Sequence, residues 1–272
     1  MMNYLKIAVW FSIGGLTLGM LLYGVAVGDQ PKNLVQERVK GKNMKPDTAV
    51  RIVQAQSTKP ATAPGMPQYK PPKRGAPTGR VAGGTRGPGR EVFVFSVLAP
   101  DHTGLTISEQ PSLYWFISSS TTLPVELTVM DPQATKPILE TRIPLPIQPG
   151  VHRIRLADHG VRLSPRVPYR WSVAVVPDTD RRSKDILAGG AIERIELQEG
   201  LSAKLAQEGK TKAPHIFAEA GLWYDALAAL SDLIDAAPNN TVLRKQRASL
   251  MEQVGLPEIA EYEMKHTVTG GQ

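Results

Sequence analysis

Short apolar stretches, separated by Pro, Gly and Asp, fill the middle of the chain from residue 91 to about residue 197. Apolar positions alternate with arginines in residues 151–156 (VHRIRL), as in a strand with one buried face. Comparable stretches predict strands at 91–98, 112–118, 123–130, 138–143, 151–156, 169–176 and 191–197. Because turn signals separate these stretches and no long helix intervenes, we expect an antiparallel sandwich of immunoglobulin-like kind over residues 91–199, with Trp115 and Trp171 in its core.

The pattern changes to helical spacing after Gly200. Pro214 opens one predicted helix, and its apolar stripe ends before Pro238. Residues 241–254 form a second predicted helix, and a third short one begins at Pro257. The fold class that follows is mainly β plus α, with the helices at the C-terminal end.

The helical region, residues 200–272, contains a tetratricopeptide-like signature. Gly221, Ala226 and Pro238-Asn239-Asn240 fall where the second half of such a repeat places its glycine, its alanine and its closing Pro-Asn-Asn. We therefore expect a tetratricopeptide-like helical hairpin here. One such unit cannot bury its own apolar face, so it must pack on the sandwich, on a second copy of the chain or on another protein.

A long uncharged run near the start predicts a membrane segment. Residues 7–27 are 21 residues without a charge, enough for a helix to span a bilayer and longer than the apolar core of an ordinary signal peptide. We expect residues 1–28 to be a signal anchor, with a cleaved signal peptide as the alternative. The body is then exported to the periplasm, although the five basic residues that follow the run favour a cytoplasmic body under the positive-inside rule.

Composition separates residues 29–90 from the rest of the chain. This segment has nine Pro, eight Gly and a net charge of +10, with Tyr69 as its one aromatic residue, whereas residues 91–272 have a net charge of −4. Such a segment buries too little apolar surface to offset its ordering entropy, which predicts a disordered basic tether. Two uses are open for the charge: a solvated linker, or binding of anionic lipid or polyanion by residues 32–90.

Two segments supply candidate contact residues. Arg74, Arg80 and Arg86 lie in a Gly-rich stretch that has neither the Gly-Lys-Ser/Thr of a phosphate-binding loop nor the preceding strand of a dinucleotide site. Trp223 and Tyr224 stand beside Gly221 at the start of a predicted helix, where they are candidates for protein contact. Packing in the core is the alternative for both aromatic residues.

Candidate catalytic chemistry is sparse. The chain has no Cys, which excludes disulfides, Cys-ligated metal and thiol nucleophiles. The acid and histidine groupings in the sandwich region are Asp101-His102, His152 and Asp158-His159, and neither a Gly-x-Ser-x-Gly elbow nor a His-Glu-x-x-His pair accompanies them. We therefore expect no catalytic residue, no cofactor and no metal site, and we interpret these histidines as loop or core residues.

Ordered motifs along the chain resemble those of a bacterial family. They are Arg74-Gly75-Ala76-Pro77, Gly83-Gly84-Thr85-Arg86-Gly87, Leu98-Ala99-Pro100, Gly104-Leu105-Thr106, Pro111 with Leu113-Tyr114-Trp115-Phe116, Ile143-Pro144-Leu145-Pro146, Pro149-Gly150, Tyr169-Arg170-Trp171-Ser172, Asp180 with Arg182-Ser183, and residues 219–227 (EAGLWYDAL). The family that the chain resembles is domain of unknown function nine-two-eight, common in cyanobacteria and some proteobacteria. The resemblance implies an exported protein with a β-rich body and a helical hairpin, without an established activity.

One feature of the relatives is missing here. They often carry a Cys just before the Asp-rich loop, where this chain has Val176-Pro177. The resemblance therefore implies no redox or disulfide role for this chain.

The function that these observations favour is a non-enzymatic envelope protein that acts as a protein-interaction scaffold. Its expected partners are envelope proteins at the helical hairpin, the membrane at residues 7–27 and, as a possibility left open, a second copy of the chain. A polyanion or lipid-surface binder that uses the basic tether is the first alternative. An envelope-polymer hydrolase that uses the Asp and His groupings is the second.

Overall fold

The computed structural model describes residues 65–72, 80–81, 83–85 and 93–268. Within those ranges, no helix has the length and apolar character that crossing a membrane requires. The membrane segment expected at residues 7–27 lies outside them, as does most of the expected tether.

In the described part of the chain, the strands form two sheets. The first has the order β1-β2-β4-β7, is antiparallel, and consists of β1 (Gly83–Thr85), β2 (Phe93–Val97), β4 (Ser112–Ile117) and β7 (Gly150–Arg155). The second has the order β3-β9-β8-β5-β6 and consists of β3 (Gly104–Thr106), β9 (Ile186–Arg194), β8 (Pro168–Val175), β5 (Val125–Met130) and β6 (Leu139–Ile143). Its strands pair antiparallel except for β3, which runs parallel to β9.

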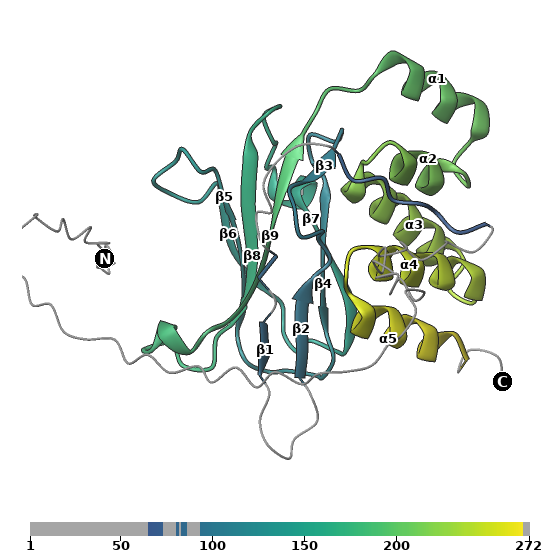
Figure 1. The fold of residues 1–272 in the computed structure, drawn as a ribbon. Coiled ribbons are helices and arrows are strands. Elements are labelled where there is room, and N and C mark those ends of the chain that lie inside the picture. Colours follow the sequence, from purple (N-terminus) through teal and green to yellow (C-terminus); the bar gives the residue numbers. More distant parts are fainter. Residues whose placement is uncertain (1–64, 73–79, 82, 86–92, 269–272) are drawn as a thin grey trace, which may run out of the picture. The chain divides into compact units, whose positions relative to one another are not determined.

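Helices follow the second sheet along the chain. They are α1 (Glu199–Glu208), α2 (Ala213–Glu219), α3 (Trp223–Ala236), α4 (Thr241–Gln253) and α5 (Pro257–Val268), and short 3-10 turns lie at Leu156–His159 (η1) and Arg182–Lys184 (η2). Helix α3 packs on β3 and β4, so that the helices form a third layer beside the four-stranded sheet (Figure 1). The class predicted from the pattern, two mainly antiparallel sheets with helices after them, is confirmed.

Strand β4 shows how the three layers share one core. Every residue from Leu113 to Ile117 is buried, because the strand is covered on both faces. Trp115 lies in the core with Trp171 of the other sheet, as predicted, and both are almost fully buried. Phe116 meets Tyr262 of α5 edge to face, with ring centroids 4.8 Å apart. A strand covered on both faces reads as a continuous apolar run, which is what SLYWFI is.

The last predicted strand is displaced in the structure. The pattern places it at 191–197, whereas β9 begins at Ile186. The pair Gly189-Gly190 has the composition of a turn but lies inside β9. A Cβ on Gly190 would stand 2.7 Å from the Cβ of Ala99, so a larger residue would not fit at this position. The glycine therefore permits close packing inside the body and does not mark a strand end.

Parts of the segment predicted as a tether are packed on the body. Val81 pairs with Gly189 through two backbone hydrogen bonds of 3.0 and 2.9 Å, and β1 pairs with β2. Tyr69 is 2% exposed. At these residues the structure differs from the disordered tether expected for 29–90, because the composition of the whole segment conceals short stretches that fit the body.

Candidate functional site

Residues 65–72 (GMPQYKPP), which we call the strap, cross helices α2 and α4 as an extended chain (Figure 1, dark blue). Pro67, Pro71 and Pro72 explain the conformation, since proline lacks the N–H that a continuing helix needs and disfavours the helical region for the residue before it. The residues that hydrogen-bond or ion-pair with the strap form what we call the strap site: His102, His215, Ala218, Glu219, Gln246 and Gln253.

The strap site holds mainly the backbone of the strap. The Gln253 side-chain amide accepts from the Tyr69 N–H at 2.8 Å and donates to the Pro67 carbonyl at 2.9 Å. Gln253 also donates to the Ser249 carbonyl of its own helix at 3.0 Å, which fixes the orientation of the amide. A primary amide has the same donor and acceptor as a peptide group, so this contact selects an extended backbone and not a particular side chain.

Further contacts fix the two ends of the strap. The Gly65 carbonyl accepts from His215 Nε2 at 3.1 Å and from Gln246 Nε2 at 3.0 Å. Nearer the other end, the Lys70 N–H donates to the Ala218 carbonyl at 3.0 Å. Helices α2 and α4 therefore each hold the strap, in the manner of one extended peptide bound by two helices.

Tyr69 is the buried side-chain anchor. Its hydroxyl donates to His102 Nε2 at 2.9 Å, and its ring meets Trp223 edge to face at 5.1 Å. The Asp101 carboxylate lies 3.1 Å from His102 Nδ1, which places the proton on Nδ1 and leaves Nε2 as the acceptor. Burial raises the pKa of Tyr69 above its ordinary value, so the phenol stays neutral and holds the strap as a hydrogen-bond donor.

Lys70 supplies the one ion pair that the structure describes between the strap and its site. Lys70 Nζ lies 2.9 Å from Glu219 Oε1, and Lys204 Nζ of α1 lies 3.1 Å from Glu219 Oε2. Hydrogen bonds from these two ammonium groups hold the pKa of Glu219 below its usual value. The side chains are about half exposed, so the pair contributes less than about 1 kcal/mol and acts mainly on orientation.

Gly221 is adapted to the strap. Its φ is +77°, and a Cβ built on it would stand 2.7 Å from the Lys70 carbonyl oxygen. Both the turn between α2 and α3 and the close passage of the strap therefore require glycine there. The sequence contained this signal, although a tetratricopeptide signature accounts for the same glycine without a strap.

The two aromatic candidates for protein contact, Trp223 and Tyr224, lie inside the body. Their relative exposures are 0% and 1%, which favours the core alternative. Trp223 Nε1 donates to the Leu98 carbonyl at 2.9 Å. The Tyr224 hydroxyl accepts from Trp171 Nε1 at 2.8 Å and donates to the Ala191 carbonyl at 3.0 Å. The start of α3 thus forms hydrogen bonds with residues of both sheets or beside them.

Asp225 adds a further hydrogen bond between α3 and the five-stranded sheet. Its Oδ2 accepts from the Ile107 N–H, 3.1 Å away at the end of β3. Burial raises the pKa of Asp225 to about 6, although hydrogen bonds from Ile107, Thr106 and Ser108 act in the opposite direction. Sequence reasoning missed this residue, since nothing in the run EAGLWYDAL distinguishes a partly buried carboxylate from a surface one.

Arg80 links distant segments of the chain through hydrogen bonds to three backbone carbonyls. It donates from Nη1 to the Ala99 and Val254 carbonyls at 3.0 and 2.9 Å, and from Nη2 to the Gly255 carbonyl at 2.7 Å. These bonds link the sandwich to the turn between α4 and α5, and they give no support to a role for Arg80 in binding anions. The other two candidates, Arg74 and Arg86, lie outside the described residues.

The remaining histidine candidates are held separately. His152 stacks on Trp115 with ring centroids 4.6 Å apart, and its Nε2 donates to the Gln148 carbonyl at 2.7 Å. Asp158 and His159 lie in η1. Across the described part of the chain, no three His, Cys, Asp or Glu side chains are placed to hold a metal ion.

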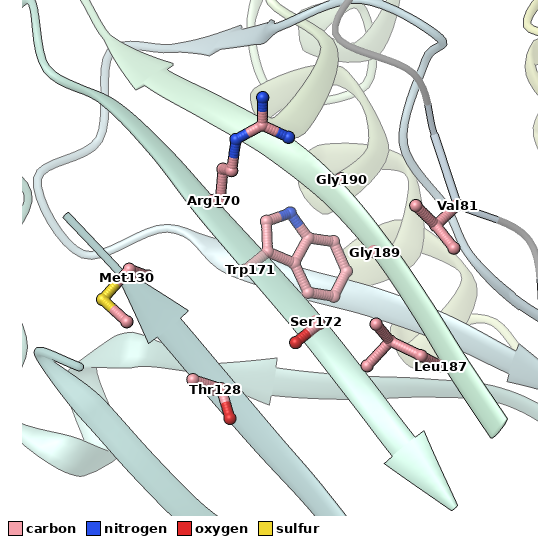
Figure 2. Close-up of a pocket in the computed structure, with 9 residues that line it drawn as sticks. All are labelled: Val81, Thr128, Met130, Arg170, Trp171, Ser172, Leu187, Gly189 and Gly190. Atoms are coloured by element: carbon pink, nitrogen blue, oxygen red, sulfur yellow. The ribbon is translucent and has the colours of Figure 1, made fainter. Parts of the chain in front are cut away.

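A second feature is a hollow of about 200 Å³ on the five-stranded sheet (Figure 2). Trp171 lies in its middle, with Thr128 and Val81 on opposite sides, Arg170 above and Ser172 below in the view of Figure 2. All three polar side chains are partly or fully exposed to water, so none is held in place as a buried recognition group would be. The strap site, with its buried anchor and fixed amide, is the better candidate.

Comparison with known proteins gives one family. The model described as Domain of Unknown Function (DUF928) matches residues 81–264, which confirms the resemblance noted in the sequence. No curated protein matches the chain. The matched range contains every residue of the strap site, whereas the strap itself precedes it.

Proposed function

This chain belongs to the DUF928 family, whose function is unknown, and we propose that it is a non-enzymatic envelope protein that acts as a scaffold for protein contacts. Residues 7–27 would anchor it in the inner membrane or direct its export, with the body in the periplasm. The helical region would be the surface for its envelope partners. In this proposal, the sandwich is of immunoglobulin-like kind and the helices are tetratricopeptide-like.

One observation carries the proposal: the helical region already holds an extended peptide. Gln253 binds both the N–H of Tyr69 and the carbonyl of Pro67, and helix α2 holds the backbone of Lys70 through Ala218. Stacked helix pairs commonly present extended binding surfaces. Here α2 packs against α3, and α4 against α5, which supports the tetratricopeptide-like interpretation.

The environment of His102 supports a non-enzymatic role. A catalytic base must reach the proton that it takes from a substrate. His102, the best placed of these histidines, has its two ring nitrogens on Tyr69 and Asp101, and Tyr69 is 2% exposed. This arrangement is suited to holding the strap.

Photo-crosslinking in living cells tests the scaffold proposal. A photoreactive amino acid replaces Val242, which is 53% exposed on α4, in the full-length chain. Leu187 on β9, 45% exposed, is the matched control position. We expect discrete crosslinks to envelope proteins from position 242 and none from position 187. Crosslinks from position 187 alone would move the contact surface to the sheet and contradict the role of the helices.

A reporter fusion tests the compartment separately. Alkaline phosphatase, which is active outside the cytoplasm, is fused after Gln272. We expect phosphatase activity, with a cytoplasm-active reporter at the same position silent. The reverse result would place the body in the cytoplasm, as the basic residues after the membrane segment favour, and would exclude the envelope proposal.

A further inference from the structure

We infer that the strap site also binds an extended segment of another protein, one with a tyrosine followed by a basic residue between prolines, and that the strap occupies the site until such a segment displaces it. This inference rests on the proposed scaffold function and names the chemistry of the partner. The strap itself, Pro67-Gln68-Tyr69-Lys70-Pro71, is the template for that chemistry.

The contacts define which segments fit. Hydrogen bonds at Gly65, Pro67, Tyr69 and Lys70 all involve the backbone of the strap, so they require an extended chain and leave most side chains open. Prolines supply that conformation at low entropic cost. Two side chains carry the selectivity: the buried Tyr69 phenol on His102, and the Lys70 ammonium on Glu219.

The strap and its site lie far apart along the chain. His102, the first residue of the strap site in the chain, and Gln253, the last, both fall within the matched residues 81–264. The strap, residues 65–72, falls before them. The binding surface therefore belongs to the matched body, and the strap reaches it as a separate segment of the chain.

The strap buries few of its side chains. Gly65, Gln68, Lys70 and Pro71 are exposed, whereas Pro67 and Tyr69 are buried. Because the strap belongs to the same chain, its effective concentration at the site is of order millimolar. An external segment must therefore bind more tightly than the strap or be presented at high local concentration, as on a membrane protein nearby.

Titration with a peptide tests the inference. The probe is the peptide GMPQYKPP, labelled with a fluorophore at its N-terminus and titrated into the full-length chain in detergent. Tyr69→Ala removes the anchor of the strap and leaves the strap site intact, so we expect its apparent affinity for the peptide to exceed that of the wild type about 100-fold. Gln68→Ala, a change at an exposed strap position, is the matched control and should behave as the wild type.

A milder variant guards against misfolding. Tyr69→Phe keeps the ring packed on Trp223 and removes only the hydroxyl that donates to His102. We expect this variant to bind the peptide up to about 10-fold more tightly than the wild type does. Adding Gln253→Ala to Tyr69→Ala should abolish binding, as should replacing the tyrosine of the peptide by alanine.

Three results would overturn the inference. The first is absence of peptide binding by folded Tyr69→Ala and Tyr69→Phe chains up to millimolar peptide, and the second is equal binding by both variants and the wild type. The third is a dimer of the wild-type chain that the peptide dissociates, which would make a second copy the occupant. If the peptide does not bind but position 242 still crosslinks to envelope proteins, the scaffold proposal stands and only the proposed chemistry of the partner is wrong.

Discussion

The pH dependence of stability should reveal the state of Asp225. Burial raises the pKa of this carboxyl to about 6, from 3.8 in an unfolded chain. Between these two values the folded chain binds the proton and the unfolded chain does not, so the free energy of unfolding falls as the pH rises. The contribution of Asp225 to stability is therefore greatest below pH 4 and is lost as the pH rises through about 6.

The size of this effect follows from the two pKa values. A carboxyl with these values makes the folded chain about 2 kcal/mol more stable at pH 4.5 than at pH 7. Other carboxylates titrate in the same range, among them Glu126 and Glu219, whose pKa values are held below normal by cationic neighbours. Their effect has the opposite sign, so only a difference between variants isolates Asp225.

Asp225→Asn provides that difference, because the amide keeps the shape of the side chain and does not titrate. Urea denaturation of both chains, followed by tryptophan fluorescence at pH 7 and pH 4.5, gives the two free energies of unfolding at each pH. We expect the wild type to gain about 2 kcal/mol over the variant between pH 7 and pH 4.5. A loss over the same range would refute the reasoning. It would mean that the N–H donors around Asp225, Ile107 above all, stabilise the charged carboxylate more than burial destabilises it.

Two further substitutions test the packing around the strap and among the helices. Gly221→Ala should cost about 1–3 kcal/mol in thermal denaturation, since φ is +77° and the new Cβ would meet the Lys70 carbonyl at 2.7 Å; Gly200→Ala, with no atom within 4 Å, should cost nothing. Arg247→Met should cost about 3–5 kcal/mol, because it leaves the carboxylate of Glu263, now 2.7 Å from the guanidinium, buried without that partner. Changing both members of the pair to Met should recover most of this loss, and an additive loss would contradict the argument.

The strands were the most predictable part of the fold. Alternation of apolar and polar positions is a local property, and a strand such as β5, with buried Val125, Leu127 and Val129, carries it in its own sequence. Strand β3 has three residues and takes its place by pairing with β9, which lies about eighty residues later. No local pattern can specify a strand that short, because its stability comes from the partner and not from its own residues.

The candidate site was less predictable, for a related reason. Trp and Tyr are common both in protein interfaces and in cores. The sequence therefore cannot tell whether Trp223 and Tyr224 contact another protein or another part of the same chain. The structure decides this through backbone carbonyls, at Leu98 and Ala191, whose positions depend on the whole sandwich. Residue type alone therefore identifies side chains that favour burial, without identifying what buries them.

Tyr69 is the residue whose structural role the composition of its segment conceals most. Averaged over residues 29–90, a single aromatic residue among many prolines and glycines indicates disorder. A folded body nearby changes that conclusion, because buried Pro67 and Tyr69, together with backbone contacts such as those from Gln253, hold these eight residues on it. In the inference made above, a segment of another protein displaces the strap by bringing an equivalent tyrosine and basic residue in an extended chain. Two parts of the chain thus cover the helices: β3 and β4 pack on α3, and the strap hydrogen-bonds to α2 and α4.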